Sequence, residues 1–247
     1  MLKSLSYIFR DKAFFKHFFM LFIFVFTSNF LTNLSGVLDS VLGKYSIWYN
    51  IVLIAGYIVM FIPYGYSMEL LKLNLKDKEG LNALEMNVFQ NFKDGFRVVV
   101  SSSILVLSVL ILFVILGFIS KLLSDKFGIM GTSFVFTFVF LIFLIISFLM
   151  IAMCCRYVIK PSWLNFLDLK SAGLLINNNV AQYFKVYALS ALLIIMLCVI
   201  TIFLTIVLTK IGFSGFVLYN ILVSLLWTYL TFVFAKLFAY AVDVDKI

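Results

Sequence analysis

The sequence has few charged residues and almost no proline. Charged residues make up 12% of its 247 positions, against about 25% in typical soluble domains, and apolar residues make up 64% against about 45–50%. Only two prolines occur, so long stretches contain no residue that would break a helix. This composition excludes an ordinary soluble domain and is typical of a protein built from long membrane helices.

The sequence also lacks the motifs that carry common enzyme chemistry. It contains no H-E-x-x-H, no G-x-S-x-G and no P-loop pattern. His17 is the single histidine, and apart from Asp11 no acidic residue lies at helical spacing from it, so its expected role is packing at the membrane interface. We therefore expect a protein that is not an enzyme, with no catalytic residue, no cofactor and no metal site.

Cysteine is scarce as well. Cys154 and Cys155 precede Arg156 at the end of an apolar run, and Cys198 lies in the middle of another. A cysteine next to a membrane helix can be palmitoylated, but packing as a small apolar side chain is the favoured interpretation. We expect no structural disulfide, because the adjacent pair is predicted to face the reducing side of the membrane.

No acidic residue lies inside an apolar run. Ionisable groups within a bilayer are costly and usually functional, so their absence weakens a mechanism of proton-coupled transport. The main polar groups within the runs are Asn29 and Asn33, one helical turn apart, together with scattered serines and threonines. The favoured interpretation is hydrogen bonding between helices, and the alternative is a polar path through the helix bundle.

What the sequence does contain is six continuous apolar runs, each close to the ~20 residues that a helix needs to cross a bilayer. Membrane β-barrels show short alternating segments instead. We predict an all-α integral membrane protein whose residues 1–247 form a single six-helix membrane domain, with no soluble domain. The first run could also be a cleaved signal peptide, but no small-x-small cleavage site follows it. The predicted spans are residues 18–34, 47–66, 98–120, 133–155, 186–208 and 213–235.

The basic residues are distributed unequally between the two sides of these spans. Fifteen lysines and arginines fall on the side of the two termini, and four fall on the opposite side. Because basic loops stay in the cytoplasm, we predict a multi-pass protein of the plasma membrane with both termini cytoplasmic. The net charge of +8 comes without a contiguous basic tract. The predicted partners are therefore anionic lipid headgroups and not nucleic acid.

Aromatic and basic residues lie side by side where several spans begin. Leu81, Leu84, Val88, Phe89, Phe92 and Phe96 follow one face of a helix. This spacing predicts an amphipathic helix over residues 81–97 that lies in the membrane interface, with a bend at Gly95 before the third span. The predicted interface anchors of the chain are Lys16, Phe89, Phe92, Lys93, Arg97, Arg156, Lys160 and Lys185.

The same pairing of aromatic and basic residues recurs along the chain. It occurs in YIFRDKAFFKHF, VFQNFKDGFRVV and NNNVAQYFKVYA, before the first, third and fifth spans. Lys16 and Arg97 are 81 residues apart, and Arg97 and Lys185 are 88 apart. This spacing predicts three parallel repeated units, each with an interfacial segment and a helical hairpin. The alternative is that any cytoplasmic approach to a span attracts lysine and aromatic residues.

Two segments carry a resemblance to a known family. They are GLNALEMNVFQNFKDGFRVVVSSSILVL and WLNFLDLKSAGLLINNNVAQYFKVYALSALL. With Gly65 and Tyr66 at the end of the second span, F-K-D-G-F at residues 92–96 and Tyr183-Phe184 before the fifth span, the chain resembles domain-of-unknown-function family 4013, a group of six-helix prokaryotic membrane proteins. The prolines often found in the second loop of that family are missing here. The resemblance implies a six-helix architecture and no agreed activity.

Two classes of function fit these observations. The favoured one is a non-enzymatic, lipid-associated component that organises the membrane, because interfacial segments are predicted and buried charge is absent. The alternative is a transporter or permease subunit for a small solute, which the six spans and the asparagines within them favour. An enzyme that acts on lipid has the least support, because no catalytic constellation is present.

Overall fold

The computed structural model of this protein describes residues 12–42, 47–76, 86–161, 168–178 and 180–242. In these ranges all regular structure is helical and no strand occurs. Six helices are long and apolar enough to cross a membrane, which confirms the predicted all-α fold and a multi-pass membrane protein. The helices are α2 (Lys12–Leu42), α3 (Ile47–Lys76), α4 (Val88–Phe127), α5 (Ile129–Ile159), α6 (Leu169–Asn177), α7 (Val180–Leu208), the short 3₁₀ turn η3 (Thr209–Ile211) and α8 (Phe213–Ala241).

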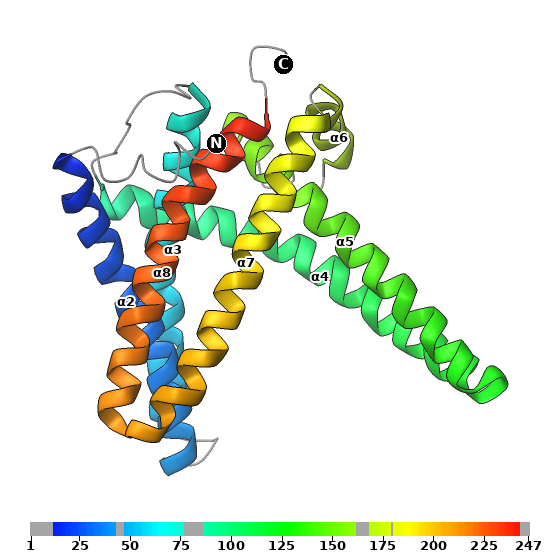
Figure 1. The fold of residues 1–247 in the computed structure, drawn as a ribbon, viewed down its shortest axis with the longest axis horizontal. Helices are drawn as coiled ribbons and strands as arrows, with labels where there is room; N and C mark the ends of the chain where they lie inside the picture. Colours follow the sequence, from blue (N-terminus) through cyan, green and yellow to red (C-terminus); the bar gives the residue numbers. More distant parts are fainter. Residues whose placement is uncertain (1–11, 43–46, 77–85, 162–167, 179, 243–247) are drawn as a thin grey trace.

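The six long helices follow one another up and down (Figure 1). The last turn of α3, the short helix α6, the first turn of α7 and the last turn of α8 lie at one end of the molecule (the top in this view). Helices α2, α3, α7 and α8 run along one another, whereas the α4–α5 hairpin slants away to the side. Asp168 caps α6, because its Oδ1 accepts a hydrogen bond from the Ser171 N–H at 3.0 Å.

Consecutive helices pack as the pairs α2–α3, α4–α5 and α7–α8. The three pairs are not packed alike, because α4 also makes an extensive contact with α3 and the α4–α5 hairpin leaves the bundle. The predicted threefold repeat of equivalent hairpins therefore stays a prediction.

The core lies where α2, α3, α5 and α8 meet, and α4, α6 and α7 contribute fewer residues to it. The ring of Phe232 on α8 packs edge-on against Phe14 of α2, with centroids 5.0 Å apart, and against Tyr66 of α3 at 6.0 Å. Tyr66 is fully buried. Cys154 and Cys155 of α5 belong to the same core, and the Cys155 thiol lies 3.5 Å from the Phe238 carbonyl oxygen. The two adjacent cysteines are therefore packing residues, as the favoured interpretation expected.

Helix α4 does not begin with a separate interfacial segment at the positions that the structure describes. Residues 88–97 form its first turns, and the helix continues to Phe127 without a break at Gly95. The helix is unbroken at Gly95, and the predicted turn from the interface into the membrane at this residue stays a prediction. The earlier part of that predicted helix, residues 81–85, lies outside the described residues. At 40 residues, α4 is about 60 Å long, twice the ~30 Å thickness of the hydrocarbon core.

Gly95 marks the point where α4 crosses α3. A Cβ atom on Gly95 would lie 1.7 Å from the carbonyl oxygen of Phe61, and one on Gly65 would lie 1.8 Å from that of Asn91. The two backbones are therefore in direct contact, as small residues allow between membrane helices. The Phe61 ring packs against both Phe92 and Phe96, with centroids 5.6 Å apart in each pair.

Candidate functional site

Polar side chains join α2 to α8. The Asn29 amide donates to the Ser224 hydroxyl at 3.0 Å, and the Asn33 amide donates to the Asn220 side-chain oxygen at 2.8 Å. Asn220, Ser224 and Thr228 are fully buried. The two asparagines therefore occupy the arrangement that interhelical hydrogen bonding requires. Asn220 and Ser224 were not among the predicted polar contacts. With Thr228 they are polar residues at every fourth position of an otherwise apolar helix.

This arrangement makes Asn33→Leu a specific test. The substitution leaves the buried Asn220 oxygen without its donor, so we expect the free energy of unfolding in detergent to fall by about 1 kcal/mol, without a change of topology. Thr137→Leu is the control, because the Thr137 hydroxyl is exposed and bonds only to a carbonyl of its own helix. Equal stability of the two variants would show that the Asn33–Asn220 bond contributes nothing.

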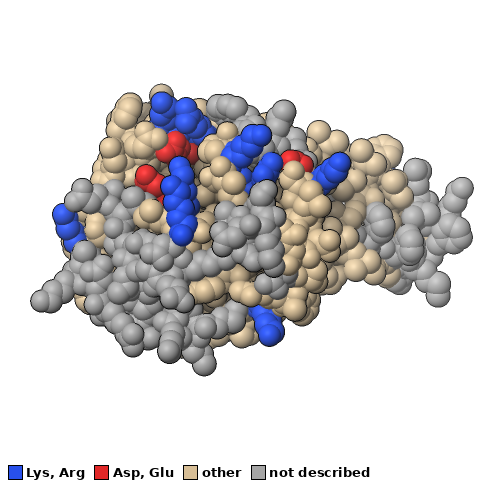
Figure 2. Space-filling model, turned by 90° about the horizontal axis from the view of Figure 1, so that it is seen from above, with Lys and Arg blue, Asp and Glu red and all other residues tan. Residues whose placement is uncertain are grey.

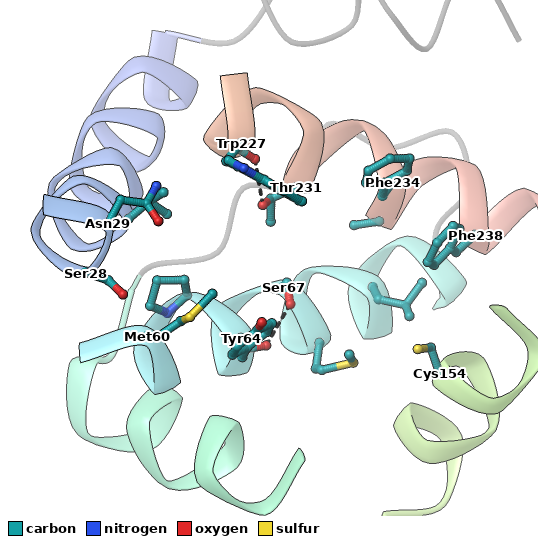
Figure 3. Close-up of a pocket in the computed structure, with 15 residues that line it drawn as sticks. Ser28, Asn29, Met60, Tyr64, Ser67, Cys154, Trp227, Thr231, Phe234 and Phe238 are labelled. Carbon is teal, nitrogen blue, oxygen red and sulfur yellow. Dashed lines mark hydrogen bonds between the residues drawn. The ribbon is translucent and has the colours of Figure 1, made fainter. Parts of the chain in front are cut away.

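Next to this polar contact lies a cavity of about 480 Å³. Helices α3 and α8 form its two walls, with Ser28 and Asn29 of α2 at one end and Cys154 of α5 at the other (Figure 3). None of the described residues that line it is charged. The lining residues are Val25, Ser28, Asn29, Met60, Pro63, Tyr64, Ser67, Met68, Leu71, Cys154, Trp227, Thr231, Phe234, Ala235 and Phe238.

Helical spacing explains why these side chains meet. On α3 the lining positions recur every three or four residues from Met60 to Leu71, and on α8 they do so from Trp227 to Phe238, so each set occupies one helix face. The serine and threonine hydroxyls on these two faces already have partners. Ser67 donates to the Tyr64 carbonyl at 2.7 Å, and Thr231 donates to the Trp227 carbonyl at 3.0 Å. The cavity wall therefore offers mainly apolar contact.

The cavity has an open side. Tyr64 is 39% exposed and Trp227 is 45% exposed, although both lie within apolar helices that are long enough to span a membrane. The part of α3 from Met60 to Leu71 advances by eleven residues, which is about 17 Å along the helix axis. One leaflet of the hydrocarbon core is about 15 Å thick, half of ~30 Å. The cavity therefore matches one leaflet in length and opens between α3 and α8.

The predicted interface anchors do not converge on this cavity, because none of them lines it. Phe89 is 79% exposed and remains available to lipid, whereas Phe92 packs against Phe61. Lys and Arg side chains spread over the end of the molecule seen in Figure 2. Of the predicted basic anchors, Arg156 is half-buried, and the exposed ones are Lys16, Lys93, Arg97, Lys160 and Lys185.

His17 packs inside the protein, and its predicted position at the membrane interface stays a prediction. Its side chain is buried on α2, with only 5% exposed. The Nδ1 atom has no hydrogen-bond partner among the described residues, and these residues contain no group of three His, Cys, Asp or Glu side chains that could hold a metal ion. Its position on the inward face of α2 explains the burial, because Phe14 and Leu21 on the same face are buried as well.

A second cluster joins α5 to α7 outside the cavity. The Tyr183 hydroxyl accepts a hydrogen bond from the Ala152 N–H at 3.0 Å and donates one to the Phe148 carbonyl. One turn later, the Tyr187 hydroxyl lies 2.9 Å from the Ser147 hydroxyl. Sequence reasoning treated Tyr183 only as part of a motif, because nothing local to α7 shows that its partner is the backbone of α5.

The comparisons with known proteins give one family. The family model described as "Protein of unknown function (DUF4013)" matches residues 49–209. No curated protein and no solved structure matches the chain. The matched range includes Gly65, Gly95 and Tyr183, so the residues that carried the resemblance include those at the α3–α4 crossing and the α5–α7 contact. Because this match extends over more than half of the sequence, the chain belongs to the DUF4013 family.

Proposed function

We propose that this protein is a non-enzymatic membrane component that associates with lipid and organises it in the cytoplasmic leaflet of the plasma membrane. The cavity between α2, α3 and α8 is the observation that carries this proposal. Its described lining is uncharged, and the hydroxyls of Ser28, Ser67 and Thr231 each donate to a backbone carbonyl, so it favours apolar groups over a polar solute. The open side at Tyr64 and Trp227 gives lipid a lateral route into it.

The distribution of charge supports the same proposal. Lys and Arg side chains lie on the end of the molecule at which α3 and α8 end and α7 begins. Each basic residue near an anionic membrane surface contributes roughly 1 kcal/mol. Anionic headgroups on the cytoplasmic side are therefore the proposed partners of this face.

Native mass spectrometry of the purified protein tests this function. We expect phospholipid to remain bound after detergent exchange, with anionic species enriched over their share of the source membrane. An unrelated six-helix membrane protein, purified in parallel from the same cells, is the control for nonspecific carry-over. Equal lipid retention by both proteins would contradict the proposal.

The alternative is a transporter or permease subunit, and the position of Asn29 on the cavity wall favours it. A defined non-lipid small molecule in the same mass spectra would support this alternative. The hydrogen bond from Asn29 to Ser224 gives Asn29 a structural role that needs no solute. The lipid-associated function is preferred for this reason.

The orientation in the membrane can be tested with reporter fusions. Fusions after Asp243 and within residues 77–82 should report the cytoplasm, and fusions at Gly43 and Gly128 should report the outside, because basic loops are retained in the cytoplasm. The two groups of fusions are controls for each other's expression. A cytoplasmic signal at Gly128 would contradict the six-span topology.

A further inference from the structure

We infer that the cavity between α2, α3 and α8 is a binding site for one acyl chain of a phospholipid in the leaflet next to the basic face. This inference rests on the proposed lipid-associated function and names its ligand and its site. Three properties of the cavity carry it: its length, the chemistry of its walls and the side on which it opens.

The length and volume of the cavity fit a single acyl chain. Its lining on α3 runs from Met60 to Leu71, about 17 Å along the helix axis, and one leaflet is about 15 Å thick. Its volume of about 480 Å³ lies in the lower half of the ~300–1,000 Å³ range of small-molecule sites. A chain that lies along the membrane normal fills such a space, whereas the two chains of one lipid would need a wider one.

The walls select an apolar ligand. Met68, Leu71 and Phe234 contribute apolar surface. The Ser67 and Thr231 hydroxyls donate to their own helices, and the Ser28 hydroxyl donates to the Gly56 carbonyl at 2.9 Å. A polar solute in this space would lose its hydrogen bonds to water and find few free partners. An acyl chain has no such bonds to lose.

The position of the opening selects a ligand from the membrane. The half-exposed rings of Tyr64 and Trp227 flank it, and both belong to membrane-spanning helices. Cys154, at the other end of the cavity from Asn29, lies two residues before Arg156 and close to the end of α5 that adjoins α6. A chain in the cavity therefore places its headgroup toward the basic face, which favours an anionic phospholipid.

Photolabelling in vesicles tests the inference. The protein is reconstituted into vesicles of zwitterionic and anionic phospholipid that contain a phospholipid with a diazirine in its acyl chain. After illumination, mass spectrometry of peptides measures labelling of residues 60–71, which include the cavity wall of α3, and of residues 192–203 of α7, most of which are exposed. Labelling of the cavity should saturate, and excess unlabelled anionic phospholipid should compete with it, while labelling of α7 should follow the bulk lipid. Cavity labelling that stays proportional to α7 labelling would overturn the site.

A filled cavity gives the matched comparison. Ser67→Phe combined with Thr231→Phe places a ring on each wall, because these residues face each other across the cavity (Figure 3). We expect cavity labelling to fall by about tenfold or more, as the apolar contacts of several methylene groups are lost. Ser108→Phe combined with Thr205→Phe is the control, because both side chains are exposed on other helices. Cavity labelling that persists in the filled variant would overturn the site.

The competition experiment on the unmodified protein needs no substitution, so it decides the question even if the filled variant does not fold. The two proposals also fail separately. Lipid retained in native mass spectra without competed labelling would leave the lipid-associated function standing and overturn this site. Competed labelling with no excess of retained lipid would support the site and contradict the organising function.

Discussion

Gly95→Ala should destabilise the protein by about 3 kcal/mol, the upper end of the usual range for an overpacked core. The added methyl group would lie 1.7 Å from the Phe61 carbonyl oxygen and 2.6 Å from its carbonyl carbon. Both are backbone atoms of α3, so no side chain can turn away to make room. The helices must separate, and the contacts of the Phe61 ring with Phe92 and Phe96 are lost with them. Thermal unfolding in detergent measures the effect.

Gly117→Ala is the matched control, because Gly117 lies on the same helix with nothing within 4 Å of the added atom. Alanine favours a helix over glycine by about 1 kcal/mol, so this variant should be at least as stable as the unmodified protein. Gly65→Ala, on the α3 side of the crossing, should repeat the loss seen at Gly95. Unchanged unfolding temperatures for Gly95→Ala and Gly65→Ala would contradict the direct backbone contact.

Tyr183→Phe should lower the free energy of unfolding by about 2 kcal/mol, because its hydroxyl makes two hydrogen bonds to α5 and each contributes about 1 kcal/mol net. The substitution removes the hydroxyl that accepts from the Ala152 N–H and donates to the Phe148 carbonyl. These two groups of α5 are four residues apart, the spacing of the helix's own hydrogen bonds, so the hydroxyl links α7 to them as an additional partner. The ring remains in place, and its edge-on contact with the Phe148 ring, whose centroids are 4.9 Å apart, is kept.

Tyr187→Phe separates the role of the hydroxyl from that of the ring. Its hydroxyl bonds to the Ser147 hydroxyl, which also donates to the Leu144 carbonyl, so no backbone group loses its partner. We expect a loss below about 1 kcal/mol. Denaturant unfolding of both variants, compared under the same detergent, gives the difference. Equal losses at the two positions would show that the aromatic rings, and not the Tyr183 hydroxyl, hold α5 against α7.

The residues that carried the family resemblance have structural roles which sequence reasoning did not assign. Gly95 was interpreted as a bend, since glycine permits unusual backbone conformations. The same absence of a side chain also permits two helices to touch, and only the position of Gly65 on a neighbouring helix shows this second role. Phe92 was interpreted in the same way as a lipid anchor, but its ring packs on Phe61.

The sequence by itself determined the number of membrane helices and their approximate positions, because a bilayer requires a continuous apolar run of about 20 residues, and such runs are visible in one chain without any knowledge of its neighbours. It also marked Asn29 and Asn33 as groups that need hydrogen-bond partners. Only the tertiary structure decided that these partners are Ser224 and Asn220, that α3 and α4 cross at two glycines, and that α2, α3 and α8 leave a cavity between them. These features depend on the packing of residues far apart in the chain, and a period of 3.6 residues shows which face of a helix is apolar without showing what that face meets.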